Sequence, residues 1–270
     1  MMPPRTRITV YIENGRDFCH SYTELGENKG MTLQKKMEML QTTQLFRGIS
    51  ADMLKPLAKR AVKRHLNSGE VLFLAGEPAR GLYVIVSGSV RAFRLSEEGR
   101  EQTIHVEFAG ATVAEVPVFD GGTYPSTVMT EEESVVLFLE KEAVLTFLRQ
   151  NPEAALSALA VLAGRLRRVA SLVEGLSLQD VMQRLSAMLI EEAKRRHGHI
   201  QNGDFFLLPN SHQKLAARIG TVREVVTRNL NRLIDEGLIA VVGHRITILK
   251  VTALNDKAKG KPQRNVPQKV

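Results

Sequence analysis

The sequence has very little cysteine and no long apolar run. Cys19 is the one cysteine among 270 residues, so no disulfide can form within the chain and a cysteine-ligated iron–sulfur cluster is excluded. This usage fits a protein of the reducing cytoplasm. No run of 18 apolar residues and no signal-peptide pattern is present, so we expect no membrane segment.

Motifs of common enzyme classes are also missing. The chain has no G-x-S-x-G turn, no phosphate-binding loop with its lysine and no H-E-x-x-H zinc motif. His197 and His199 form a weak metal-binding pattern, which we interpret as surface residues. We therefore expect neither an enzyme nor a metal protein.

Basic residues outnumber acidic ones. The net charge is +8 and the isoelectric point is near 9.7, which points to an acidic partner such as nucleic acid or an anionic surface. Residues 211–250 contain seven basic and three acidic residues, a net charge of +4. Half of the net charge of the chain therefore lies in these forty residues.

A heptad pattern marks the middle of the chain. Asn151 and Pro152 form a typical helix start, with a capping side chain followed by proline at the first helical position. Apolar residues then recur at alternating steps of three and four, which is typical of a helix that pairs with its own copy. These positions are Leu159, Leu162, Leu166, Val169, Val173 and Leu176. An amphipathic helix that packs only on its own domain is the alternative.

Before this helix, the hydrophobic period is that of β-strands. Short β-rich runs separated by glycine turns indicate a small antiparallel barrel or jelly roll. The runs are residues 71–74, 82–86, 90–95, 102–106 and 135–139. Helices are expected at 32–45 and 53–63, the second capped by Ser50.

After the long helix, the pattern is that of a winged helix-turn-helix. Residues 212–219 and 222–235 are predicted helices around the turn at Gly220, and residues 238–249 form a hairpin, the wing. The residues expected to contact DNA are Ser211, His212, Gln213, Thr221, Val222, Arg223, Glu224, Thr227, Arg228, His244 and Arg245.

Within this motif, the second helix carries the candidate base-reading residues. Arg223, Glu224, Thr227 and Arg228 are expected on one exposed face near its N-terminus, the end that enters a major groove. Arginine can bond guanine through two donors, and glutamate can accept from cytosine. The alternative is that these are solvated charges.

The order of these parts carries a family resemblance. The stretch SGEVLFLAGEPARGLYVIVSGSVRAFR, with glycines at 69, 76, 81 and 88, resembles the cyclic-nucleotide-binding type of β-barrel. Together with the heptad helix and the winged motif, it resembles the Crp/Fnr family of bacterial transcription regulators over about residues 35–252.

The resemblance implies an α+β architecture and a regulator that acts as a homodimer on palindromic double-stranded DNA, with RNA polymerase as a further partner. In this family the barrel senses an effector and the long helix is the dimer axis. Arg223, Glu224 and Arg228 match the branch that reads a TGTGA-like half-site, and Asp180 stands at the hinge as a helix cap.

Composition, together with this order of parts, sets the expected domain boundaries. They are a disordered extension at 1–30, with Met31 as an alternative start, a sensor barrel at 31–150, a dimerisation helix at 151–178, a winged helix-turn-helix domain at 179–252 and a basic disordered tail at 253–270.

The effector segment departs from the cyclic-nucleotide receptors. Glu115, Phe119 and Ser126 match their phosphate cassette, but Pro125 replaces the phosphate-binding arginine. Without that partner a buried phosphate would be poorly stabilised, so an effector other than cyclic AMP is expected. The expected pocket is Val113, Glu115, Phe119, Tyr124, Pro125, Ser126, Thr127, Val169 and Ala170, the last two lacking the hydroxyls that would hold adenine.

Two further alternatives stay open for the barrel. The Tyr124-Pro125 pair is similar to branches that include haem-binding sensors, with His65, His105 or Cys19 as the axial ligand. A degenerate barrel without any effector is the other alternative. A cyclic-nucleotide-regulated enzyme is disfavoured because no catalytic module is present.

Overall fold

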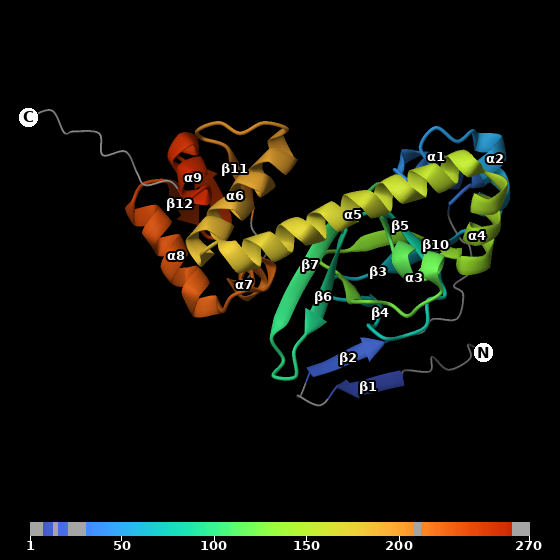
Figure 1. Ribbon diagram of the computed structural model, residues 1–270, viewed down its shortest axis with the longest axis horizontal. Helices are drawn as coiled ribbons and strands as arrows, with labels where there is room; N and C mark the ends of the chain where they lie inside the picture. Colours follow the sequence, from blue (N-terminus) through green and yellow to red (C-terminus); the bar gives the residue numbers. More distant parts are fainter. Residues whose placement is uncertain (1–7, 13–15, 21–30, 208–211, 261–270) are drawn as a thin grey trace, which may run out of the picture. The chain divides into compact units, whose positions relative to one another are not determined.

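The computed structural model describes residues 8–12, 16–20, 31–207 and 212–260, with side chains from residue 31 onward. The chain divides into two compact units, residues 1–168 and 169–270 (Figure 1). Helix α5, Pro152–Leu178, contributes residues to both units.

The first unit is built around two antiparallel four-stranded sheets, with strand orders β3-β10-β5-β8 and β4-β9-β6-β7. Their bounds are Val62–Leu66 (β3), Val71–Phe73 (β4), Gly81–Ser87 (β5), Ser89–Leu95 (β6), Glu101–Phe108 (β7), Thr112–Val113 (β8), Thr127–Thr130 (β9) and Ser134–Glu140 (β10). This arrangement confirms the predicted barrel or jelly roll, although β3, β8 and β9 were not among the expected strands.

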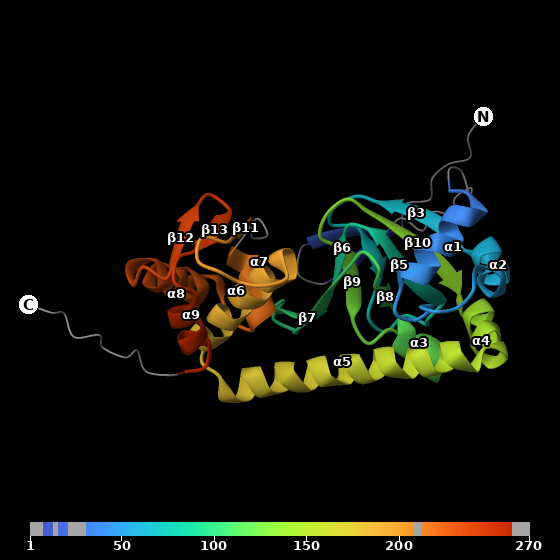
Figure 2. The ribbon, with the colours of Figure 1, turned by 90° about the horizontal axis from the view of Figure 1, so that it is seen from above.

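Helices cover one side of this barrel. They are α1 (Leu33–Thr42), α2 (Ala51–Arg60), α3 (Glu115–Asp120) and α4 (Lys141–Gln150), followed by the first part of α5 (Figure 2). Ser50 accepts a hydrogen bond from the Met53 backbone N–H and caps α2, as the sequence indicated. An apolar core joins α1, α2, α4 and the start of α5 to β5 and β10.

Two of the turn glycines are required for different reasons. Gly88 has a φ of +81°, and a Cβ there would lie 2.2 Å from the Ser134 Oγ atom. Gly81 begins β5, where a Cβ would lie 2.2 Å from the Leu139 carbonyl oxygen. Close approach of β5 to β10, rather than a left-handed turn, therefore requires the second glycine.

The second unit contains α6 (Val181–His197), α7 (His212–Ile219), α8 (Arg223–Asp235), α9 (Val251–Ala258) and a sheet of order β11-β13-β12. The strands are Phe205–Leu207 (β11), Ile239–Val242 (β12) and Arg245–Ile248 (β13). The predicted helix pair and wing are confirmed. Asp180 caps α6, since its side chain accepts from the Gln183 N–H at 2.8 Å while the Gln183 side chain accepts from the Asp180 N–H at 2.7 Å.

The structure corrects the expectations for both ends of the chain. Within the predicted disordered extension, β1 (Ile8–Ile12) pairs with β2 (Arg16–His20). The β-branched residues of β1, at positions 8, 9, 10 and 12, favour a strand. The predicted tail from residue 253 is wrong for 253–258, which belong to α9. Leu254 is fully buried in the core of the second unit, and Lys257 pairs with Glu236 at 2.8 Å.

Candidate DNA interface and sensor site

The recognition helix α8 is fixed by its apolar face. Val226, Leu230 and Leu233 are buried in the core of the second unit. Because these residues anchor one side of the helix, the opposite side is left to solvent. Arg223, Glu224 and Arg228 are exposed there, as the sequence predicted.

Thr227 differs from its neighbours on this helix. Its hydroxyl donates to the Arg223 carbonyl at 3.0 Å and lies 2.8 Å from the His212 Nδ1 atom of α7. Since the hydroxyl hydrogen serves the carbonyl, the imidazole Nδ1–H donates to Thr227. Thr227 therefore joins the two helices and has little capacity left for a base. Ser211 lies outside the described residues, and Gln213 is exposed on α7.

The wing presents two further predicted contact residues. His244 and Arg245 are exposed at the tip of the β12–β13 hairpin. The Arg245 guanidinium stacks over the Phe205 ring of β11, 3.6 Å from its centroid. This stacking limits the freedom of the Arg245 side chain and sets its direction.

Most heptad positions of α5 are exposed, whereas Leu162 is half-buried. Ala154 and Ala158 are buried on the barrel side, whereas Leu159 is 62% exposed, Leu166 71% and Val173 57%. These exposed side chains form an apolar strip along α5 that is interrupted at Leu162.

The cassette glutamate is already bound to an arginine. Glu115 is fully buried, its Oε1 atom lies 2.8 Å from Arg165 Nη2, and the Thr112 hydroxyl donates to the same oxygen. Within the described part of the chain, the Glu115 Oε2 atom has no hydrogen-bond partner. The Arg165 side chain is only 14% exposed.

The remaining cassette residues have different surroundings. Tyr124 is buried, and its ring stacks on Phe73 with a centroid distance of 3.8 Å. Burial raises the pKa of Tyr124, and its hydroxyl accepts from the Arg80 N–H at 3.2 Å. Val113 belongs to the same core, whereas Pro125 is exposed.

An arginine that sequence reasoning missed reaches this segment. Arg94 of β6 donates from Nη1 to the Pro125 carbonyl at 3.1 Å. Its side chain is exposed, and no spacing in the sequence connects it with the cassette. Val169 and Ala170, the other expected pocket residues, are exposed on α5.

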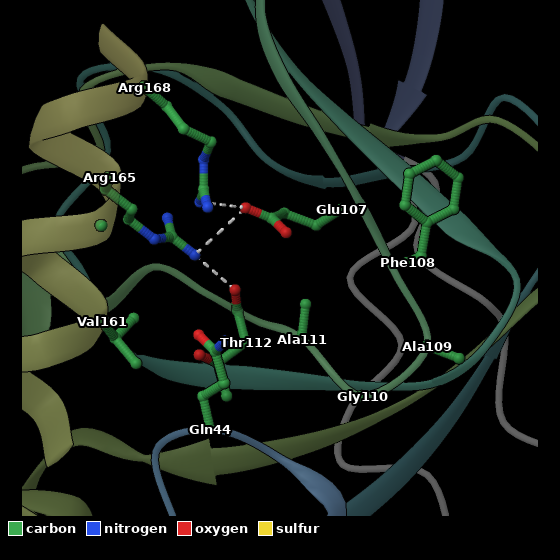
Figure 3. Close-up of a pocket in the computed structure, with 11 residues that line it drawn as sticks. Gln44, Glu107, Phe108, Ala109, Gly110, Ala111, Thr112, Val161, Arg165 and Arg168 are labelled. Carbon is green, nitrogen blue, oxygen red and sulfur yellow. Dashed lines mark hydrogen bonds and ion pairs between the residues drawn. The ribbon is translucent and has the colours of Figure 1, made fainter. Parts of the chain in front are cut away.

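A cavity of about 280 Å³ lies between α5, the turn from β7 to β8 and the segment after α1 (Figure 3). Arg168 Nη2 lies 2.7 Å from Glu107 Oε1, and Arg165 Nη2 lies 3.9 Å from the same atom. Burial raises the pKa of Glu107, and the two arginines oppose this shift. The full lining is Gln44, Glu107, Phe108, Ala109, Gly110, Ala111, Thr112, Val161, Gly164, Arg165 and Arg168. It shares no residue with the pocket expected from the sequence.

The histidines suggested as haem ligands have different surroundings. His65 is exposed and lies 3.3 Å from Glu133. Burial lowers the pKa of His105 to about 3, with Arg165 and Arg168 adding repulsion, so this imidazole is neutral. Cys19 lies in β2, outside the residues with described side chains. Where side chains are described, no three His, Cys, Asp or Glu residues form a metal-binding group.

A barrel of this type, a long helix and a winged helix-turn-helix with an exposed basic face define a DNA-binding regulator of transcription. The comparisons agree: residues 63–151 match the cyclic nucleotide-binding domain and residues 183–257 match the Crp-like helix-turn-helix domain. The chain belongs to the Crp/Fnr family of transcription regulators.

Its similarity to individual members is moderate and extends over most of their length. The chain is 27% identical to the CRP-like cAMP-activated global transcriptional regulator of Mycobacterium tuberculosis, over 82% of this chain and 99% of the relative. It is 26% identical to the fumarate and nitrate reduction regulatory protein of Escherichia coli, over 75% of this chain and 80% of the relative. The solved structure of a Crp/Fnr-family regulator from Eubacterium rectale matches in fold, with a TM-score of 0.67 and 22% sequence identity. The match covers 81% of this chain and 99% of that structure.

In the part of the chain that the structure describes, none of the helices has the length and apolar character needed to cross a membrane.

Proposed function

We propose that the protein acts as a homodimer on a palindromic operator in double-stranded DNA and regulates transcription there, with RNA polymerase as a further partner in the cytoplasm. The exposed heptad strip of α5 carries this proposal. Covering a side chain such as Leu166 contributes about 1.5–3 kcal/mol, which favours pairing of two copies of the helix. A two-fold dimer then presents two recognition helices to two half-sites.

Base reading is assigned to three residues of α8. Arg223, Glu224 and Arg228 differ in what they can donate to or accept from a base edge, and all three are exposed. The expected test is fluorescence anisotropy with a palindromic duplex selected by the protein, its single half-site and a scrambled duplex, at one salt concentration. Equal affinity for all three duplexes would contradict sequence-specific binding by a dimer.

We further propose that the barrel responds to an effector other than cyclic AMP. Pro125 offers no charge to a phosphate, and Glu115 is already paired with Arg165. Isothermal calorimetry with cyclic AMP and cyclic GMP is expected to show no binding at physiological concentrations. Sub-micromolar binding of either nucleotide would overturn this part of the proposal.

A regulator with an effector-free barrel is the second candidate. The observation that favours it is the packing of Phe73, Tyr83, Tyr124 and Phe138 in the barrel core. Native mass spectrometry of freshly purified protein distinguishes the candidates, because a retained small molecule supports an effector and a bare chain with full operator affinity supports this alternative. The absorption spectrum of the same sample tests for haem.

A further inference from the structure

Arg184 joins backbone carbonyls from two separate segments of the DNA-binding unit. It lies near the start of α6, where its Nε donates to the Ile219 carbonyl at 2.7 Å and its Nη2 to the Gly220 carbonyl at 3.4 Å. The remaining nitrogen, Nη1, donates to the Gln179 carbonyl. Ile219 ends α7 and Gly220 begins the turn to α8, whereas Gln179 lies between α5 and α6.

The acceptors of Arg184 belong to the ends of two helices. Gly220, with a φ of +67°, turns the chain at the end of α7, and the Thr221 N–H donates back to the Ala216 carbonyl at 3.0 Å. The Gln179 N–H donates to the Gly175 carbonyl at 3.1 Å, so Gln179 continues the last turn of α5. Helix C-termini carry unsatisfied carbonyls and partial negative charge. One guanidinium therefore stabilises the C-terminal ends of both α5 and α7.

The folding of the unit does not depend on this link alone. Helices α6, α7 and α8 share a core of buried side chains, among them Leu185, Leu189, Leu215 and Leu230. What Arg184 adds is a fixed relation between the end of α5 and the turn that precedes Arg223, the first residue of the recognition helix. Its planar set of donors suits several carbonyls at once, which a lysine ammonium cannot match in the same way.

We propose that Arg184 is a positioning residue that fixes the recognition helix relative to the end of α5 and thereby sets the half-site spacing that the dimer accepts. This inference rests on the proposed function, because spacing has meaning only for a dimer that reads two half-sites about 34–36 Å apart. Arg184 itself need not touch DNA.

The test compares full-length Arg184→Met with the wild-type protein. Methionine keeps an apolar stem and removes all the donors. Lys194→Met is the matched control, because Lys194 is exposed on the same helix and the change removes the same charge. Anisotropy is measured with duplexes that hold two half-sites at the preferred spacing, at spacings one base pair shorter and longer, and with one half-site alone.

We expect Arg184→Met to lose about tenfold of the preference for the correct spacing over the shifted ones, since hydrogen bonds from a charged donor are lost. Affinity for one half-site should stay close to that of the wild type, and the variant should remain folded at the assay temperature although its melting temperature falls. Lys194→Met should keep the full preference. A purely structural role would lower affinity for every duplex alike, which would overturn the inference.

Other outcomes also decide the matter. If Arg184→Met keeps the full spacing preference, the inference is overturned but the proposed function is not. The same holds if Lys194→Met loses the preference as much as Arg184→Met does. If Arg184→Met does not fold, Arg184→Lys takes its place, and an unchanged preference there overturns the inference. A wild-type protein with no preference for paired half-sites overturns the proposed function, and this inference falls with it.

Discussion

The Arg165 guanidinium of α5 lies 2.8 Å from the carboxylate of Glu115, fifty residues earlier in the chain. Glu115 is fully buried and Arg165 is nearly so. The pair therefore holds the first part of α5 to the barrel through a contact that is shielded from water and from salt.

Removing the arginine should destabilise the barrel unit. Arg165→Met leaves the Glu115 charge buried without its partner, which costs about 3–5 kcal/mol of unfolding free energy. Urea unfolding followed by tyrosine fluorescence reports on this unit, because the four tyrosines lie in residues 1–168 and tryptophan is absent. The control is Arg167→Met, an exposed arginine of the same helix, which should change stability by less than about 0.5 kcal/mol. Equal stability of the two variants would contradict the role of the pair.

A neutral, half-buried histidine, His105, makes the stability of the barrel depend on pH. The pKa of His105 falls from 6.5 to about 3 on folding, so the unfolded chain binds more protons between these values. The contribution of the neutral imidazole to the free energy of unfolding is complete above pH 6.5. It is lost as the pH falls below 6.5, because the unfolded chain then takes up a proton that the folded chain does not. When the pH is lowered from 7 to 5, the free energy of unfolding of the wild type should fall by about 1–2 kcal/mol more than that of His105→Gln. Unfolding curves that shift equally with pH in both proteins would argue against a neutral, half-buried imidazole.

The hydrogen bond between His212 and Thr227 should show as an energetic coupling between α7 and α8. A double-mutant cycle compares the operator-binding free energies of the wild type, His212→Ala, Thr227→Val and the double variant. We expect a coupling of about 0.5–1.5 kcal/mol, with the preferred sequence unchanged, because Thr227 orients the helix and does not read a base. Additive effects, or a changed base preference in Thr227→Val, would show that the hydroxyl contacts DNA instead.

Dimerisation should depend on the exposed strip of α5. Leu166→Asp places an unpaired charge in the interface twice per dimer, so we expect a monomer that has lost specific DNA binding. Sedimentation equilibrium measures the oligomeric state, and Ser171→Asp, an exposed position off the heptad, is the control that should remain dimeric. A Leu166→Asp protein that sediments as a dimer and still binds the operator would contradict the assignment.

Local periodicity accounts for the parts of the fold that could be predicted. The strands of β5, β6 and β10 and the helix-turn-helix pair follow from hydrophobic spacing and glycine turns. Helix α9 was missed because the lysines, glycine and prolines after residue 255 outweighed Leu254, whose burial depends on tertiary packing. The short helix α3 contains Pro117, which obscured its pattern.

The site shows the same division between local and tertiary information. The exposure of Arg223, Glu224 and Arg228 follows from helical spacing alone. The link from Thr227 to His212 joins residues 15 positions apart, and that from Arg165 to Glu115 joins residues 50 apart. Neither contact has a periodic signal, so only the folded chain shows them.

Selection of binding sites from random duplexes tests the central claim, that α8 reads base edges of a palindrome. At one fixed salt concentration, the wild type should return two inverted half-sites. Arg223→Ala should cost about 1–3 kcal/mol per half-site and relax the preference at one base pair. Glu224→Ala should change preference more than affinity, whereas Lys250→Ala should weaken all sequences alike. If Arg223→Ala and Glu224→Ala both return the wild-type sequence with weaker binding, α8 does not read the major groove.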